Sequence, residues 1–218
     1  MAKSALLTNP PLDCPLCERL VEYRRENQQS YPDYFNAPAP SFGDRNAQFL
    51  IVGLAPGVHG ANRTGRPFTG DYAGDLLYST MAKFGFSNDR FKADPKDGLK
   101  LNDAMVTNAV RCVPPQNKPV GAEIRTCRPF LVNQIAALKK LKVILCLGRI
   151  AHDSTLAALG LKAKDAPFGH GAAHDVKGRA LRLFDSYHCS RYNTNTRRLT
   201  PEMFEAVFAD IRAEIDKS

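Results

Sequence analysis

Tryptophan is absent from the 218 residues of the chain, and no apolar run approaches the roughly 18 residues that a membrane-spanning helix needs. The first residues include a lysine but lack the long apolar segment and the small-residue cleavage site of a signal peptide. No repeat, low-complexity tract or linker divides the chain. We therefore expect a single domain over residues 1–218, without a membrane partner, in a reducing intracellular compartment.

The composition is ordinary for a globular protein, with 44% hydrophobic and 24% charged residues. The charges are unbalanced, because 30 Lys and Arg against 22 Asp and Glu give a net charge of +8. Clustered cations release counterions when they bind phosphates, so this excess favours a polyanionic partner such as nucleic acid. Charge alone does not identify that partner.

Apolar patterning predicts four strands that alternate with helices. Short apolar runs indicate buried strands at residues 49–52, 104–110, 141–148 and 180–188. Helical periodicity indicates helices at residues 14–27, 72–84, 123–141, 149–159 and 200–215. This order is typical of the α/β class, with a parallel sheet covered by helices on both faces.

One long loop, GLAPGVHGANRTGRPFTGDYAG at residues 53–74, follows the first predicted strand and precedes a predicted helix. Ligands of open α/β folds bind at this end of the strands, and six glycines let the backbone turn tightly and approach a ligand closely. The loop lacks the G-x-G-x-x-G spacing and the P-loop lysine of nucleotide sites, which argues against a nucleotide-binding redox enzyme. A loop of this length in a compact domain is more often functional than a simple connection.

Six cysteines in a reducing compartment are more typical of metal ligands, catalytic groups or core thiols than of disulfides. Cys14 and Cys17 form a C-x2-C pair, and Cys112 and Cys127 flank a proline-rich turn that can bring two ligands together. Four thiolates favour zinc or an iron–sulfur cluster. The spacing alone leaves structural zinc, a cluster and no metal as open alternatives. Cys146, inside a predicted strand, is interpreted as a core thiol.

Four further motifs follow one another along the chain: GLAPGVHGANRTGRPFTGD (53–71), AVRCVPPQNKP (109–119), LGRIA (147–151) and SYHCSRYNTNTRRLT (186–200). Together with CPLCERLV near the start, this set resembles the family 5, or B-type, uracil-DNA glycosylases. These proteins are relatives of the family 4 iron–sulfur glycosylases. The resemblance spans nearly the whole chain and depends on the set of motifs more than on any one of them.

The resemblance implies a three-layer α/β/α fold with a four-stranded parallel sheet and a [4Fe–4S] cluster on Cys14, Cys17, Cys112 and Cys127. It implies hydrolysis of the N-glycosidic bond of uracil flipped out of DNA, and some family members also accept hypoxanthine, xanthine or modified pyrimidines. On the same ground we expect a monomer that acts on DNA containing uracil or deaminated bases. Its expected location is the cytoplasm of a bacterium or archaeon, in association with the nucleoid.

The resemblance also implies roles for side chains near the strand ends. Asp71 matches the catalytic aspartate, and Phe68 matches the residue that stacks on the base. His188 matches the histidine that donates a hydrogen bond to a carbonyl oxygen of the leaving base, and Asn117 matches an asparagine that family 5 members bring to the site. Each has a structural alternative: a helix cap for Asp71, a core ring for Phe68, a structural imidazole for His188 and a turn residue for Asn117.

Asn108, in VTNAV, departs from the family pattern, because family 5 members carry a small apolar residue at this position. An amide can pair with both a carbonyl and an N–H of a base, so Asn108 favours uracil as the substrate. The alternative is a buried amide that backbone groups satisfy. Gly53 and Ala55, at the start of the long loop, are expected to lie against the base.

HCSRYN, at residues 188–193, stands where other glycosylase families have the sequence H-P-S-P. Arg191 and Tyr192 are then expected to wedge into the duplex as the base leaves. Arg63 and Arg66 of the long loop are expected to bind DNA as well. The structural alternative for Arg191 and Tyr192 is an ordinary solvated loop.

A rival hypothesis is a non-catalytic iron–sulfur or zinc protein that binds nucleic acid through its basic surface. Such a protein has no need of a carboxylate and an imidazole in a base-sized pocket. The arrangement of Asp71 and His188 therefore discriminates between the two hypotheses.

Overall fold

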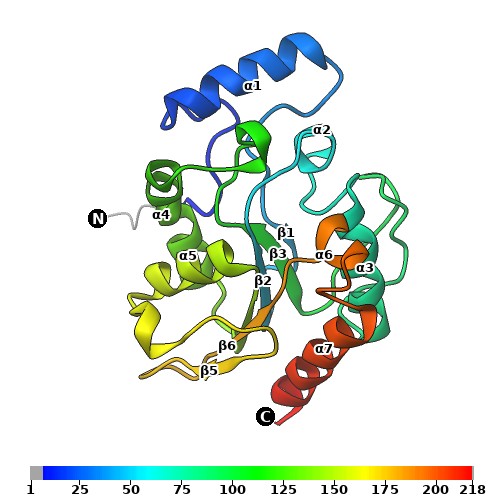
Figure 1. Cartoon of the computed structure of the whole chain (residues 1–218), viewed down its shortest axis with the longest axis vertical. Helices are drawn as coiled ribbons and strands as arrows, with labels where there is room; N and C mark the ends of the chain where they lie inside the picture. The colour runs from blue at the N-terminus through cyan, green and yellow to red at the C-terminus, as the bar shows by residue number, and fades with distance from the viewer. Residues whose placement is uncertain (1–6, 218) are drawn as a thin grey trace.

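The computed structural model of the chain describes residues 7–217 and has a six-stranded sheet at its centre (Figure 1). The strand order is β1-β3-β2-β4-β6-β5. The four central strands are parallel: β3 (Ala104–Asn108), β2 (Phe49–Gly53), β4 (Val143–Leu147) and β6 (Arg182–Ser186). The edge strands, β1 (Phe42–Gly43) and β5 (Ala173–Asp175), pair antiparallel. The expected core of four parallel strands is confirmed, but the sheet has six strands. The two edge strands were not predicted, because strands of two and three residues are too short to show a period.

Helices cover both faces of the sheet, as expected for a three-layer α/β/α fold (Figure 1). On one face α4 (Gly121–Ala137) packs against α5 (Arg149–Leu159), and on the other α3 (Tyr72–Lys83) packs against α7 (Pro201–Asp216). The start of α7 is capped by the Thr200 hydroxyl, which accepts a hydrogen bond from the Met203 amide. Within residues 7–217, no helix combines the length and the apolar character needed to cross a membrane.

The core follows from the two-residue period of the strands. All five residues of β2 are buried, and alternate side chains enter different hydrophobic clusters. Phe49 and Ile51 pack under α3 and α7, whereas Leu50 and Val52 pack under α4 and α5. A strand buried on both faces reads as a continuous apolar run, which is why the central strands could be located from the sequence.

Three helical segments lie beyond the carboxyl ends of the strands. α1 (Glu18–Ser30) starts four residues later than expected and contacts the segment after β3 through Leu20. α2 (Ala61–Thr64) lies inside the long loop, and α6 (Arg191–Asn195) follows the last parallel strand. The two short helices were not expected, because four or five residues are too few for a helical period.

Arg66 holds the long loop in place from inside the protein. The side chain is buried, and its Nη1 and Nη2 atoms donate to the Asp97 carboxylate at 2.9 and 2.7 Å. Its guanidinium also lies over three aromatic rings, those of Phe42, Tyr78 and Phe91. The expected contact of Arg66 with DNA is therefore replaced by a buried ion pair, and the partner Asp97 comes from the polar excursion between α3 and β3.

The backbone at Phe68 is strained and is held by its neighbours. Phe68 has φ of 53°, in the left-handed region that is unfavourable for a residue with a side chain. One residue earlier, the Pro67 carbonyl accepts a 2.7 Å hydrogen bond from the Tyr78 hydroxyl on α3. A Cβ at Gly74 would overlap the Phe68 carbonyl oxygen, so only glycine allows the helix to approach this closely.

Asp97→Asn should lower the free energy of unfolding by ~3 kcal/mol, because it leaves the buried Arg66 guanidinium without a counter-ion. Arg66 holds the pKa of Asp97 well below its usual range. This contribution is therefore present above about pH 4 and is lost as the pH falls through the lowered pKa. Urea denaturation at neutral pH measures the effect.

As a control, Asp153→Asn removes an exposed pair with Arg149 and should change the free energy of unfolding by less than ~1 kcal/mol. Equal losses in the two variants would contradict the role assigned to Arg66.

Candidate active site

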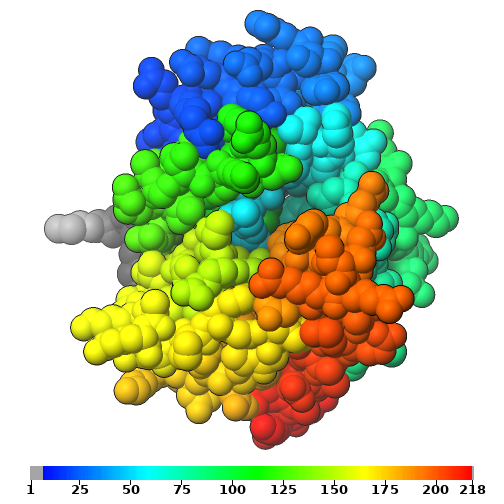
Figure 2. Space-filling view, in the orientation of Figure 1, coloured from blue at the N-terminus to red at the C-terminus, as the bar shows by residue number. Residues whose placement is uncertain are grey.

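A cavity of about 360 Å³ opens at the carboxyl ends of β2, β3 and β6. Figure 2 shows the corresponding hollow between the surfaces formed by residues near 60, 115 and 190. The volume falls within the range of roughly 300–1,000 Å³ that is usual for small-ligand sites. The lining includes seven residues that were expected in the site: Ala55, Phe68, Asp71, Asn108, Asn117, His188 and Arg191.

Asp71 occupies the N-cap position of α3 without capping it. Its backbone has the extended conformation of a cap residue, but its carboxylate accepts no capping hydrogen bond. Oδ1 is buried without a partner among the described residues, and burial raises the pKa of Asp71, an effect that the Ala73 and Gly74 amides partly oppose. A Cβ at Gly60 would overlap Oδ2. The carboxylate thus lies near the first amides of α3 without a hydrogen bond of capping geometry, and Oδ1 stays unpaired, so capping alone does not account for Asp71. Asp71 lines the cavity as a base stronger than an exposed aspartate.

Phe68 and His188 form one wall of the cavity. Their rings are stacked with 5.9 Å between centroids and 27° between planes. The His188 ring makes no hydrogen bond to the described residues, and burial lowers its pKa to about 4. The imidazole is therefore neutral at pH 7 and can donate one N–H into the cavity.

Asn108 ends β3 and lies over Gly53, its partner in the parallel register with β2. A Cβ at position 53 would stand 2.5 Å from Asn108 Oδ1 and 2.6 Å from Phe68 Cζ. Gly53 thus makes the room in which the amide and the ring both reach the cavity, and does not itself line it. The Asn108 amide has no hydrogen-bond partner within residues 7–217, so the alternative of a backbone-satisfied asparagine does not apply.

Asn117 reaches the cavity from a 3-10 turn, Pro115–Asn117, between prolines. Its backbone φ of 57° is left-handed, a conformation that asparagine tolerates better than most residues. A Cβ at Gly57 would lie 3.8 Å from Asn117 Oδ1 and 3.7 Å from Asp71 Oδ2. Side-chain oxygens of Asn117 and Asp71 therefore lie near the same point of the loop.

Sequence reasoning missed several residues of this cavity. Tyr72 lines it, and its ring lies 5.3 Å from the Arg191 guanidinium carbon. Ser190 also lines it, and its hydroxyl accepts a 3.4 Å bond from the Asn193 amide as the cap of α6. A serine followed by a helix-compatible segment is a recognisable cap signal.

Three of the four side chains expected at DNA, those of Arg63, Arg191 and Tyr192, are exposed, and Arg191 lines the cavity. Arg191 and Tyr192 begin α6, and the Tyr192 side chain is 72% exposed. Arg63 is exposed and donates from Nε to the His59 carbonyl at 2.9 Å. Both residues lie in short helix α6 and not in the irregular loop that was the alternative, and both are exposed to solvent.

The four cysteines of the expected metal site come together around a second, small cavity. Cys14 and Cys17 precede α1, Cys112 follows β3 and Cys127 lies in α4. Burial raises the pKa of Cys17 to about 11 and that of Cys112 to about 12, and the negative charge of Cys127 adds to both. A bound cation would remove this mutual repulsion of the thiolates.

These four thiols are not gathered at the spacing of a bound zinc ion. Zinc holds thiolates about 3.8 Å apart, given Zn–S bonds of ~2.3 Å in a tetrahedron. Within residues 7–217, no three of the four thiols lie within 4.8 Å of one another. Four soft thiol ligands around one cavity are a donor set that both zinc and iron–sulfur clusters use.

Cys146, His152 and Asp185 are the one described group of three possible metal ligands within 4.8 Å of one another. Both His152 ring nitrogens are already bonded, Nδ1 to Asp185 Oδ1 at 2.7 Å and Nε2 to the Ala166 carbonyl at 2.9 Å. Burial opposes protonation of His152, but the Asp185 bond outweighs it and raises the pKa. The group is therefore a buried ion pair beside a core thiol, with no free imidazole lone pair for a metal.

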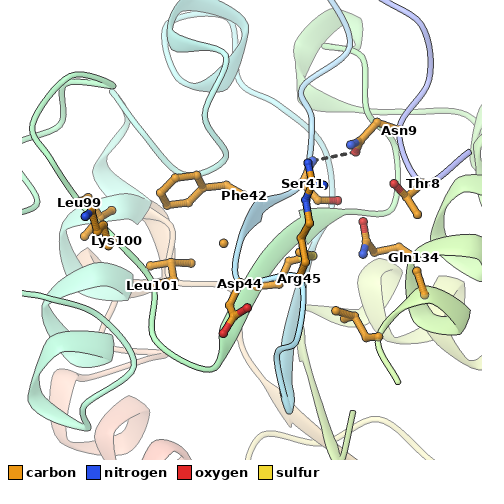
Figure 3. A pocket seen from close by; sticks show the side chains of 14 residues that line it. Thr8, Asn9, Ser41, Phe42, Asp44, Arg45, Leu99, Lys100, Leu101 and Gln134 are labelled. Atoms are coloured by element: carbon orange, nitrogen blue, oxygen red, sulfur yellow. Dashed lines mark hydrogen bonds between the residues drawn. The ribbon is translucent and has the colours of Figure 1, made fainter. Parts of the chain in front are cut away.

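A larger cavity of about 820 Å³ lies beside the sheet edge (Figure 3). Phe42 and Leu101 stand on one side of it, and Thr8, Asn9 and Gln134 on the other (Figure 3). It flanks the amino-terminal half of β3, away from the strand ends where α/β folds bind ligands. The smaller cavity is the better candidate because unpaired polar groups converge in it.

Comparison with known proteins agrees with this assignment. A family model described as the uracil DNA glycosylase superfamily matches residues 40–212. The type-5 uracil-DNA glycosylase of Thermus thermophilus is 43% identical over 204 residues, which cover 91% of this chain and 92% of that protein. The chain belongs to the uracil-DNA glycosylase superfamily. The type-5 protein of Pyrobaculum aerophilum is 36% identical over 211 residues, 94% of this chain and 91% of that protein.

Type-4 members of the superfamily are more distant. The type-4 uracil-DNA glycosylase of Pyrobaculum aerophilum is 30% identical over 158 residues, 71% of this chain and 72% of that protein. The family 5 resemblance inferred from the motifs is thus confirmed.

The pKa of His188 in the folded protein should be about 4. NMR of the imidazole across a pH titration measures it, with His188→Gln used to assign the signal. Between about pH 6.5 and pH 4 the unfolded state then binds a proton that the folded state does not. The free energy of unfolding therefore decreases as the pH falls through this window. The decrease should be smaller for His188→Gln than for the parent protein. An imidazole that titrates near pH 6.5 would contradict the desolvated site.

Proposed function

We propose that this protein is a DNA glycosylase that hydrolyses the N-glycosidic bond of uracil flipped out of DNA and so initiates base excision repair. The observation that carries the proposal is the convergence of Asp71, Asn108, Asn117 and His188 on one cavity, where Asp71 Oδ1 and the side chains of the other three have no partner among the described residues. Asn108 is buried, Asp71 and His188 are half-buried, and Asn117 is exposed. A buried polar group without a partner is costly, so the Asn108 amide and Asp71 Oδ1 are best explained by a polar ligand that satisfies them. A protein that only binds nucleic acid has no need of this arrangement.

Asp71 serves the cleavage step. Glycosidic cleavage passes through an oxocarbenium-like state, and a nearby carboxylate stabilises the positive charge on the sugar. Burial makes Asp71 a better proton acceptor, so the same carboxylate can orient and deprotonate the attacking water. Asn117, whose side-chain oxygen lies near the same point of the loop as Asp71 Oδ2, can hold that water through its amide.

His188 and Asn108 serve the leaving base. A neutral imidazole donates its N–H to a uracil carbonyl oxygen, and this bond strengthens as negative charge develops on the departing base. The Asn108 amide can donate to a carbonyl and accept from the ring N–H of uracil, with the base against the Phe68 ring. This pairing favours uracil, and hypoxanthine and xanthine are further candidates because both present a carbonyl beside an N–H.

The exposed residues Arg63, Arg191 and Tyr192 supply the proposed DNA contacts. Arg191 and Tyr192, presented by α6, enter the space that the flipped base leaves, while Arg63 contacts a phosphate. We expect a monomer, of one domain, working on DNA in the cytoplasm of a bacterium or archaeon.

Cys14, Cys17, Cys112 and Cys127 would hold a [4Fe–4S] cluster. The support is the donor set, four soft thiols around one cavity. When bound, the cluster ties α1 to α4 and to the segment after β3, a structural contribution away from the base cavity.

The assay for the function uses duplexes with a single uracil, hypoxanthine or xanthine, followed by alkaline cleavage of abasic sites. Strand cleavage with uracil is the expected result. DNA binding without release of any of the three bases would refute the proposal and leave the non-catalytic binder.

Asp71→Asn should reduce kcat/KM about 100-fold or more with little change in DNA affinity. The activity of the parent protein should fall as the pH decreases through the raised pKa of Asp71, and the variant should lack this decline. Gly60→Ala should also impair activity, because its methyl group displaces the carboxylate. Gly169→Ala, which lies outside the cavity and makes only an ordinary contact with Ala172, is the matched control. Equal loss of affinity and rate in Asp71→Asn would indicate a structural carboxylate.

Protein purified without oxygen should be brown and contain about four iron atoms per chain. Cys127→Ser should lose most of the iron. Cys146→Ala, which changes a buried thiol outside the metal cavity, should keep it. A colourless protein with one zinc per chain would contradict the cluster.

A further inference from the structure

Two buried arginines flank the cysteine cavity. Arg24, on α1, is 7% exposed, and Arg111, directly before Cys112, is 1% exposed. Neither belongs to the cavity of the proposed glycosidic reaction. Buried guanidinium groups stay charged, so each requires a compensating negative charge or a complete set of hydrogen bonds.

Arg24 points toward the cysteine segment. Its Nη2 donates to the Cys14 carbonyl at 3.1 Å, and its buried Nη1 has no partner among the described residues. Arg25, the next residue on α1, is exposed. The helix therefore directs one arginine to solvent and the other toward the metal ligands.

Arg111 is bonded only to neutral groups. Its Nη1 donates to Asn9 Oδ1 and Ser41 Oγ, both at 2.9 Å, and its Nη2 donates to the Thr8 carbonyl at 3.2 Å. Its Nε is buried without a partner in the described part of the chain. Its own backbone amide donates to Cys127 Sγ at 3.4 Å, which places the residue against the ligand set.

No carboxylate neutralises either arginine within residues 7–217, and residues 1–6 contain no acidic side chain. Arg66 is buried to a similar degree, but it forms an ion pair with the Asp97 carboxylate. Thiols are the acidic groups adjacent to Arg24 and Arg111.

Four thiolates carry more negative charge than a [4Fe–4S] core or a zinc ion carries positive charge, so a ligated site is a net anion. We propose that Arg24 and Arg111 are the buried counter-charges of this metal–thiolate site, retaining the metal and setting its reduction potential. The inference rests on the proposed metal centre and adds two residues that bind no metal themselves. The two cations lower the cost of burying the anion, and the anion lowers the cost of burying them.

The test compares Arg24→Gln, which keeps a donor but loses the charge, with Arg24→Lys, which keeps the charge. Arg25→Gln is the matched surface control, and Arg111→Gln tests the second cation. In metal-loaded protein, Arg24→Gln and Arg111→Gln should release iron to a chelator roughly tenfold faster than the parent. Both should also show a lower reduction potential, because nearby positive charge favours the reduced cluster. Arg24→Lys and Arg25→Gln should behave like the parent protein.

A second comparison measures the stability of the metal-free proteins. The comparison without metal is made with Arg24→Gln, because Arg111→Gln also removes hydrogen bonds to Asn9, Ser41 and Thr8 that do not depend on a metal. Without the anionic metal site, Arg24 has no counter-charge, so metal-free Arg24→Gln should be no less stable than the metal-free parent. Greater instability of this variant without metal would show a purely structural role and overturn the proposal. Parent-like iron release and potential in both Gln variants would overturn it as well.

Failure of the metal centre is separable from failure of the counter-charge. A parent protein that takes up neither iron nor zinc after anaerobic reconstitution overturns both. If the parent binds zinc, the cluster fails, and the same variants should release zinc faster to a chromogenic chelator.

Discussion

The parallel alignment of the central strands is the constraint on which the rest of the structure depends. Parallel pairing of β2 with β3 and β4, and of β4 with β6, brings all carboxyl ends to one edge of the sheet. Loops that are far apart in the chain therefore meet there, and Asp71, Asn108 and His188 face one cavity. Helices on both faces exclude water from the strands, so this edge is where polar chemistry can be placed.

Close backbone approach makes the cavity. Glycine at positions 53, 60 and 74 leaves the space that Asn108, the Asp71 carboxylate and the Phe68 carbonyl occupy. The strained Phe68 backbone persists because the Arg66–Asp97 ion pair and the Tyr78 hydroxyl hold the flanking residues. A rigid surrounding shell keeps unpaired polar groups pointing inward, where a flexible loop would let them pair with one another or with water.

The buried arginines beside the candidate metal centre differ from Arg66 in how their charge is compensated. Arg66 is neutralised by a carboxylate, whereas Arg24 and Arg111 lie beside the cysteine segments without a carboxylate partner among the described residues. The first pair stabilises the fold by itself, but the second arrangement couples stability to the metal. The two sites share the segment after β3, since Asn108 ends the strand and Cys112 follows it.

The sequence by itself determined the α/β class, the four parallel strands, the main helices and the family, because long apolar periods and ordered motifs are local properties. It also identified half of the residues that line the cavity, including the polar residues Asp71, Asn108, Asn117 and His188. Only the tertiary structure decided that Arg66 is buried, that Asp71 does not cap its helix, and that two edge strands extend the sheet. It alone revealed Tyr72, Ser190 and the two unpaired arginines. Burial and pairing depend on neighbours such as Asp97, which lies 31 positions from Arg66, and no local pattern encodes such a distant contact.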